Sequence, residues 1–318
     1  MPAVWRDRAG WIGYGDPQPL HNRRTSCRLL TAFRSGICGL CVLLLGLTAV
    51  AGSAIAAGDL VSDWRGIPEA EVRIIAGTTP DGATYTGIEF VIADGWKVYW
   101  RSPGDAGYPP VAAWQAPAGT TVGPLAWPLP HRFIFYGLET FGYEGHLVLP
   151  APVHQVTPVG GPLHLDLSYA ACAEICVPVE ATLDLPLPDG PWPQNRHGRA
   201  LAKALSDVPV PVDAHGVRVE IVGQPATGAS STPDPVLQIT LPAGIADRLD
   251  TAGPPALIVE GPPETLFDAR QCRRNGTGLT CRAAVLTHQP IGELADVPLI
   301  LTLHDGTRGI EIRTRVRP

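Results

Sequence analysis

Two cysteines separated by three residues, Cys172 and Cys176 in the stretch YAACAEICVP, could do chemistry that the rest of the chain does not suggest. Thiols this close in sequence can form a structural disulfide, bind a soft ion such as copper(I), or pass electrons by thiol–disulfide exchange. Zinc requires four ligands, and only His154 and His164 on neighbouring predicted strands could add to the two thiolates. Spacing alone therefore leaves a redox, a structural and a metal hypothesis open.

The short spacing makes demands on the backbone. Residues four apart in one continuous strand lie about 13 Å apart, whereas a disulfide needs Cα atoms roughly 4.4 to 6.8 Å apart. The sequence therefore predicts a tight turn at residues 173–175, between a strand that ends at Cys172 and another that follows Cys176. Closing a loop of about five residues stabilises a fold by only about 2 kcal/mol. Such a bridge is a weak staple and a plausible redox switch.

A second pair, Cys272 and Cys281, flanks the segment RRNGTGLT. Its Asn-Gly and further glycine suit a hairpin turn, and a cross-strand disulfide could close that hairpin. A loop of about ten residues contributes a little under about 3 kcal/mol in the loop-entropy model. We predict that this pair is a structural disulfide.

The first 56 residues resemble an export signal. A basic region precedes the apolar run GICGLCVLLLGLTAVAGSAIAA, and Ala54-Ile55-Ala56 offers a cleavage site. We predict a signal peptide over residues 1–56, with a retained N-terminal anchor as the alternative. Cleavage would remove Cys27, Cys38 and Cys41 and leave four cysteines, an even number that indicates disulfides in an oxidising compartment such as the periplasm of a Gram-negative bacterium.

Charge and hydropathy exclude several classes of function. The chain has 24 basic and 30 acidic residues, and removing a leader with six arginines and two aspartates leaves a net charge of about −10. This acidic chain has no basic patch that would favour nucleic acid. After the leader, no segment reaches the roughly 20 apolar residues of a membrane span, so we expect no stable membrane insertion. No glycine-rich phosphate loop is present, and we predict no cofactor.

The remaining sequence predicts an all-β protein. It contains 34 prolines and 35 glycines, and its strand-like runs are bounded by turn residues. The predicted strands cover 85–94, 96–100, 145–153, 163–170, 180–187, 217–222, 236–243, 255–261, 278–286, 298–305 and 309–316. A proline-rich stretch around the short helical candidate NRHGRALAKALSD divides them. We therefore predict a β-sandwich over 57–190, a linker with a short helix over 191–212, and a second β-sandwich-like domain over 213–318.

Three motifs occur in order within residues 60–190: GWKVYWRSPGDAGYPP (95–110), WPLPHRFIFYGLETFGYEGHLVLP (127–150) and SYAACAEICVPVEATLDLPL (168–187). Together they resemble the N-terminal periplasmic domain of the membrane thiol:disulfide interchange reductases, and most of all the suppressor-of-copper-sensitivity branch. The resemblance implies an immunoglobulin-like fold. It also implies an oxidoreductase component that passes electrons from a membrane conduit protein to thioredoxin-fold periplasmic proteins.

The same resemblance assigns roles to individual residues. Cys172 and Cys176 would be the exchanging pair, the cap loop over their disulfide would contain Phe135, Tyr136 and Gly137, and Tyr99 would line the site. An apolar lid of this kind restricts exchange to partners that displace it, because a thiolate needs an open line to the sulfur.

The sequence also departs from the family. Better-known members separate the cysteines by five residues, and some have acidic residues where this chain has Phe133 and Ile134. The quoted motifs include no counterpart of the family's membrane conduit or thioredoxin domain, so electrons are expected to come from a separate partner. Two other functions stay open: a copper(I)-binding or copper-tolerance protein that uses Cys172 and Cys176, and a binding module that both disulfides merely stabilise.

Overall fold

The computed structural model describes residues 58–135, 137–155, 160–223, 235–249, 255–262, 265–287 and 291–317. The side chains of Phe135, Arg270, Gln271, Ile291 and Gly292 are not part of this description. The predicted signal peptide over 1–56 lies outside the described residues. The described residues belong to one compact unit, Ala54–Pro318.

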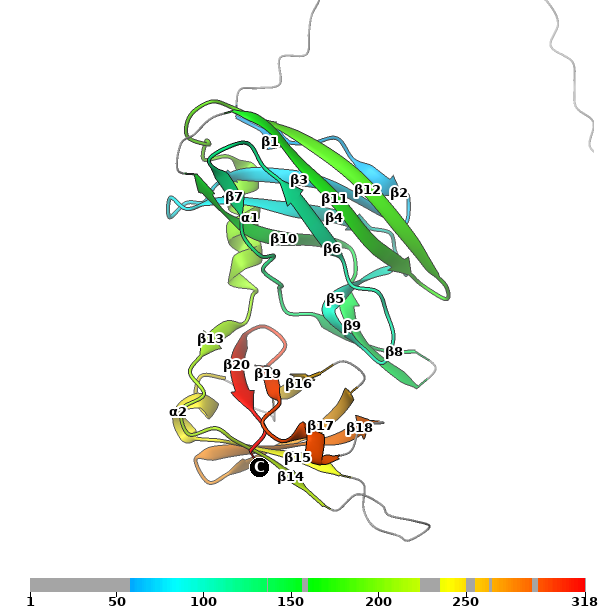
Figure 1. Cartoon of the computed structure of the whole chain (residues 1–318), viewed down its shortest axis with the longest axis vertical. Coiled ribbons are helices and arrows are strands. Elements are labelled where there is room, and N and C mark those ends of the chain that lie inside the picture. Colours follow the sequence, from blue (N-terminus) through cyan, green and yellow to red (C-terminus); the bar gives the residue numbers. More distant parts are fainter. Residues whose placement is uncertain are drawn as a thin grey trace, which may run out of the picture. The chain divides into compact units, whose positions relative to one another are not determined.

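Twelve strands form two facing sheets in the first half of this unit (Figure 1). The first sheet has the order β1-β3-β4-β10-β7, with β2 paired to β3, and the second has the order β12-β11-β5-β9-β8, with β6 paired to β11. The strands are β1 (Leu60–Val61), β2 (Arg65–Ile67), β3 (Ala70–Thr78), β4 (Thr84–Ile92), β5 (Lys97–Gly104), β6 (Val111–Gln115), β7 (Thr120–Val122), β8 (His131–Phe135), β9 (Leu138–Tyr143), β10 (His146–Gln155), β11 (Gly161–Cys172) and β12 (Cys176–Leu187).

Alternating side chains explain why the two sheets face each other. In β12 every second residue from Val179 to Leu187 is buried and its neighbours are exposed, so one face of the strand lies in the core. Tyr169 of β11 connects the sheets, because its ring meets Phe90 edge-on at 5.2 Å and its hydroxyl donates to the carbonyl oxygen of Ala70. The predicted all-β sandwich is confirmed in this part of the chain.

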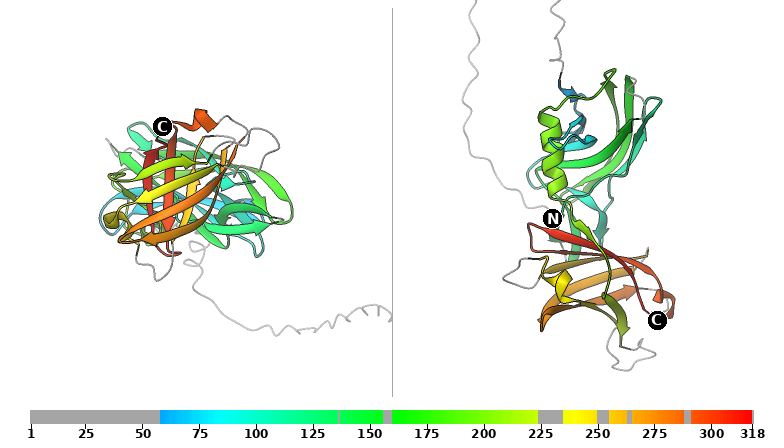
Figure 2. Two further views of the ribbon diagram at one scale, coloured as in Figure 1. Left: turned by 90° about the horizontal axis from the view of Figure 1, so that it is seen from below. Right: turned by 90° about the vertical axis from the view of Figure 1, so that its left-hand side faces the viewer.

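Helix α1 (Arg196–Ser206) fulfils the prediction of a short helix. Asn195 caps it by accepting a hydrogen bond from the Gly198 N–H, which satisfies one of the free donors of the first turn. Its apolar face packs Leu201 against Ile75 on the outer side of the first sheet, and Figure 2 shows the helix lying along that domain. Although it lies within the predicted linker 191–212, α1 is thus packed as part of the first domain.

Glu89 of β4 joins two cationic side chains on the same outer side of the first sheet. It accepts a hydrogen bond from Arg73 Nε at 2.5 Å, and its other oxygen lies 2.8 Å from His146 Nε2. Burial alone would raise the pKa of Glu89, but the hydrogen bonds from His146 and Arg73 outweigh it and lower that pKa to about 2. The hydrogen bond to Glu89 in turn raises the pKa of His146.

These opposite pKa shifts predict a stability optimum for the cluster. The contribution of Glu89 is present above its ordinary pKa of 4.5 and is lost as the pH falls toward 2. That of His146 is present below 6.5 and is lost as the pH rises through its raised folded-state pKa. Glu89→Gln should therefore lower the free energy of unfolding by roughly 1–3 kcal/mol near pH 5.5 and by much less near pH 2. Urea unfolding of both proteins measures this; an equal difference at both pH values would contradict it.

A second domain follows α1, with two four-stranded sheets packed face to face (Figures 1 and 2). One has the order β13-β20-β19-β16 and the other β14-β15-β18-β17. The elements are β13 (Val210–Val212), β14 (Arg218–Val222), β15 (Val236–Leu241), α2 (Ala243–Ala246), β16 (Ala256–Glu260), β17 (Thr265–Asn275), β18 (Gly278–Thr287), the 3-10 helix η1 (Ile291–Leu294), β19 (Pro298–His304) and β20 (Gly309–Arg315).

Within the described ranges, no helix combines the length and apolar character that crossing a bilayer requires.

Candidate active site

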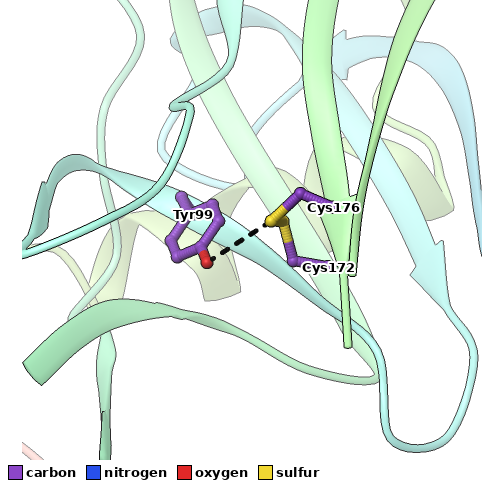
Figure 3. The surroundings of a disulfide bond; sticks show 3 residues. All are labelled: Tyr99, Cys172 and Cys176. Carbon is purple, nitrogen blue, oxygen red and sulfur yellow. Dashed lines mark hydrogen bonds between the residues drawn. A yellow bond between two sulfur atoms is a disulfide. The ribbon is translucent and has the colours of Figure 1, made fainter. Parts of the chain in front are cut away.

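The CxxxC segment forms the turn of a long β-hairpin. Strand β11 ends at Cys172 and β12 begins at Cys176, and the two residues lie opposite each other with Cα atoms 4.1 Å apart. Ala173 N–H donates to the Ile175 carbonyl oxygen at 2.9 Å and tightens the three-residue turn. The bend that a disulfide demands is therefore present, and the two sulfur atoms are bonded (Figure 3).

The two cysteines differ sharply in exposure. Cys172 is 1% exposed, because its strand is flanked by β5 on one side and β12 on the other, whereas Cys176 is exposed. A thiolate that attacks a disulfide approaches one sulfur along an open line. Of the two sulfurs, that of Cys176 is therefore the one open to an external thiol.

Tyr99 of β5 lies beside this disulfide. Its ring packs with Ala170 and Cys172 in a small buried cluster, and its hydroxyl oxygen is 3.9 Å from Cys176 Sγ (Figure 3). Burial raises the pKa of Tyr99, so the hydroxyl keeps its proton. A disulfide sulfur carries no hydrogen, so Tyr99 is the donor in this weak contact. After reduction the same hydroxyl can donate to a thiolate on Cys176 and favour that charged form.

Gly107 lies against the ring of Tyr99, and no role was expected of it from the sequence. At φ +133°, its backbone lies so close to the Tyr99 ring that a Cβ would come within 2.6 Å of Tyr99 Cδ1. The only sequence signal was its place in GDAGYPP, within the first family-like motif. Gly107 therefore holds the ring of Tyr99 from the side of the following loop.

Gly107→Ala should lower the free energy of unfolding by roughly 1–3 kcal/mol, because both backbone strain and a clash with Tyr99 result. The matched control is Gly82→Ala, which has a similar positive φ of +90° but open space around the added Cβ. The control should show the smaller effect, of about 1 kcal/mol, from backbone strain alone. Urea unfolding measures both, and equal losses would show that the contact with Tyr99 carries no weight.

The predicted cap loop lies at the tip of the β8–β9 hairpin. Gly137 is in the turn, exposed and at φ +81°. Tyr136 and the side chain of Phe135 lie outside the described residues, so the cap role stays a prediction. The sheet order places this hairpin beside β5, and Lys97 of β5 both pairs in register with Cys172 and lies 4.9 Å from the Phe133 ring centroid. The hairpin and the disulfide are thus connected through one strand.

The other cysteine pair also forms a disulfide. Cys272 and Cys281 lie opposite each other on β17 and β18, whose turn consists of Gly276 and Thr277. Cys272 is 6% and Cys281 0% exposed, and both belong to the core of the second domain. Because both cysteines are buried, an external thiol has no open approach to this disulfide, in contrast to the one that contains the exposed Cys176. The structural role assigned to this pair stays a prediction.

The metal hypotheses rest on few ligands. Across the described ranges, no group of three or more His, Cys, Asp and Glu side chains is arranged to hold a metal ion. His164, a speculative zinc ligand, places Nδ1 2.8 Å from Asp184 instead. A copper(I) site would thus consist of the two thiolates of Cys172 and Cys176 alone, after reduction of their disulfide.

Comparisons with known proteins bear on the fold. Residues 67–188 match the family model described as thiol:disulfide interchange protein DsbD, N-terminal. Residues 210–318 match a domain of unknown function, DUF8393. The first match confirms the predicted immunoglobulin-like fold, and its range contains Tyr99, Cys172 and Cys176.

A solved structure, the N-terminal periplasmic domain of ScsB from Proteus mirabilis, has a similar fold. The match has a TM-score of 0.60 and 22% sequence identity, and it covers 82% of this chain and 99% of that chain. The shared fold therefore extends beyond residues 67–188 into the second domain. A search of curated proteins finds no match.

Proposed function

We propose that this chain passes electrons through Cys172 and Cys176, because residues 67–188 match the N-terminal domain model of a thiol:disulfide interchange protein. The observation that carries the proposal is the pairing of a buried and an exposed cysteine in one tight hairpin turn. An interchange pair needs one sulfur open to a partner and a second that reverses the mixed disulfide. Burial of Cys172 and exposure of Cys176 fit these two roles.

Electrons enter the chain through two successive attacks on disulfide sulfurs. A thiolate of the electron donor attacks Cys176 Sγ, the bond to Cys172 breaks, and Cys172 leaves as a thiolate. The second thiolate of the donor then attacks the donor sulfur in the mixed disulfide and releases Cys176 as a thiolate. Two electrons have moved from the donor dithiol to this chain, and the reverse sequence reduces an acceptor disulfide. Tyr99 supports the step in which Cys176 carries negative charge.

The partners we propose are a membrane electron-conduit protein as donor and thioredoxin-fold periplasmic proteins as acceptors. Ile175, directly before the reactive Cys176, is 69% exposed, which suits contact with the apolar surface around a partner's own cysteine. We propose that this exchange takes place in the periplasm, after export of the protein.

Titration of the Cys172–Cys176 pair in glutathione and dithiothreitol buffers tests this function. We expect a reduction potential between about −180 and −270 mV, the range of disulfide exchange proteins. Alkylation of free thiols followed by mass spectrometry measures the reduced fraction of each pair. A potential below about −300 mV would contradict the proposal and mark the bridge as structural.

A further inference from the structure

One face of the second domain is buried against the first. Ile258, Thr302 and Glu311 lie side by side on β16, β19 and β20, because the register pairs Ile258 with Thr302 and Thr302 with Glu311. Ile258 is 4% exposed and belongs to the hydrophobic core cluster of the first domain. Neighbouring Leu301 and Leu303 point the other way, into the second domain's own core. The two sandwiches therefore share apolar packing.

Arg101 of β5 binds two carboxylates on this face. Its Nε donates to Glu260 Oε2 at 2.9 Å and its Nη2 to Glu260 Oε1 at 2.7 Å, a bidentate pair, while Nη2 also donates to Glu311 Oε2 at 2.6 Å. The three side chains are 22%, 13% and 10% exposed. Arg313 adds a second cation on Glu311 at 3.0 Å. Largely buried, charge-assisted pairs of this geometry hold their partners in one arrangement.

Arg101 lies in an irregular part of the strand that carries Tyr99. Tyr99 pairs with Gly142 and Gly104 with Thr140, so residues 100–103 form a bulge that faces only Phe141 of β9. A bulge interrupts the ladder hydrogen bonds and leaves the strand dependent on other contacts. Trp100 anchors the bulge in the core of the first domain, and the second domain binds it through Arg101, only two residues after Tyr99.

The same bulge holds strand β9 of the β8–β9 hairpin. Asp105, just past its end, donates its N–H to the Glu139 carbonyl oxygen and accepts the Glu139 N–H at 2.7 Å. Inside the bulge, the Trp100 ring meets Phe141 of β9 at 6.3 Å between centroids. Movement of residues 100–103 would therefore reach both Tyr99 and strand β9.

From this geometry we propose that Arg101 is a positioning residue for the exchange site, and that the second domain acts through it. The carboxylates of Glu260 and Glu311 hold the bulge, and the bulge holds Tyr99 over the disulfide and β9 beside it. The second domain then limits how far Tyr99 and β9 can move away from the disulfide, and so how widely the sulfur of the exposed Cys176 is open to attack. This inference rests on the proposed function for its purpose, although access to the disulfide can be measured without any partner protein.

The test is the rate at which dithiothreitol reduces the Cys172–Cys176 disulfide in the intact chain. One dithiothreitol thiolate attacks Cys176, Cys172 leaves, and the second thiol closes the oxidised dithiothreitol ring. Arg101→Met should raise this rate about fivefold or more, in the range of typical coupling between sites. Arg101→Lys keeps the positive charge but loses the bidentate guanidinium. Its rate of reduction should lie between those of the parent and of Arg101→Met.

Two further variants make the result decisive. Glu260→Gln with Glu311→Gln removes the same contacts from the second domain, and it should reproduce the acceleration even if Arg101→Met does not fold. Arg73→Met is the matched control, because its ion pair with Glu89 is similarly buried but lies on the other sheet. Parent-like rates in the folded Arg101 and glutamate variants, or equal acceleration by Arg73→Met, would overturn the proposal. Failure of the pair to exchange with thioredoxin-fold proteins would instead overturn the proposed function alone.

Discussion

Cys172→Ser should convert a transient mixed disulfide into a stable one. On the proposed function, Cys172 of the parent chain attacks the sulfur of Cys176 within a mixed disulfide and releases the partner. A serine hydroxyl cannot do this, whereas the exposed Cys176 thiol can still react with a partner disulfide. Incubation with an oxidised thioredoxin-fold protein should therefore accumulate a covalent complex, visible on a non-reducing gel and lost on addition of dithiothreitol. Turnover should be abolished.

The reciprocal variant is the matched control. Cys176→Ser leaves a single thiol at Cys172, which is 1% exposed and cannot be approached along an open line. We expect at least about tenfold less covalent complex, because reactivity requires access to the sulfur. Equal trapping by both variants would show that burial of Cys172 does not direct attack. If both serine variants exchanged at the parent rate, Cys172 and Cys176 would be ruled out as the reacting groups.

The two disulfides should differ strongly in their reduction by dithiothreitol. Cys281 is 0% exposed within the second core, so its bridge becomes accessible only when that domain opens. An opening free energy of about 3 kcal/mol or more makes reduction roughly 100-fold slower, since every 1.4 kcal/mol is a factor of ten. Timed alkylation and mass spectrometry should therefore find Cys172 and Cys176 labelled long before Cys272 and Cys281.

Two double substitutions separate the accessibility of each disulfide from its contribution to the free energy of unfolding. Cys272→Ala with Cys281→Ala should lower the free energy of unfolding by up to about 3 kcal/mol, and Cys172→Ala with Cys176→Ala by about 2 kcal/mol or less. Urea unfolding compares the two. If instead both disulfides are reduced at one rate and their removal has equal effects, the distinction between an exchanging and a structural bridge is wrong.

Much of the local structure could be predicted from the sequence. The spacing of Cys172 and Cys176 required a bend, and the Asn-Gly between Cys272 and Cys281 indicated a hairpin, because both features act within a few residues of each other. Alternation of apolar side chains indicated the strands that became β11 and β12. The motifs around Tyr99 and the cysteines led to a family-like site, and the structure brings those three residues together.

Several strands were not expected from the sequence. They include two long ones, β3 with 9 residues and β17 with 11, the second of which has a register shift between Ala269 and Gln271. The others are short. β6, β7 and the cap strands β8 and β9 carry weak alternation, since their pairing depends on neighbours elsewhere in the chain. The exposure of Cys176 and burial of Cys172 could not be predicted either. Both cysteines end a strand, and which one is covered depends on β5, a strand some seventy residues earlier in the chain.

The contact of the second domain with the strand of Tyr99 could not be predicted from the sequence. Arg101 lies in the first family-like motif, where only Tyr99 was assigned a role, and Glu260 and Glu311 lie in ordinary strand patterns. No periodicity links these three positions, because their contact depends on how two separately formed sandwiches meet. Local spacing could thus identify a cysteine pair capable of exchange, but only the packing of one domain on the other shows that Arg101, two residues after Tyr99, binds Glu260 and Glu311.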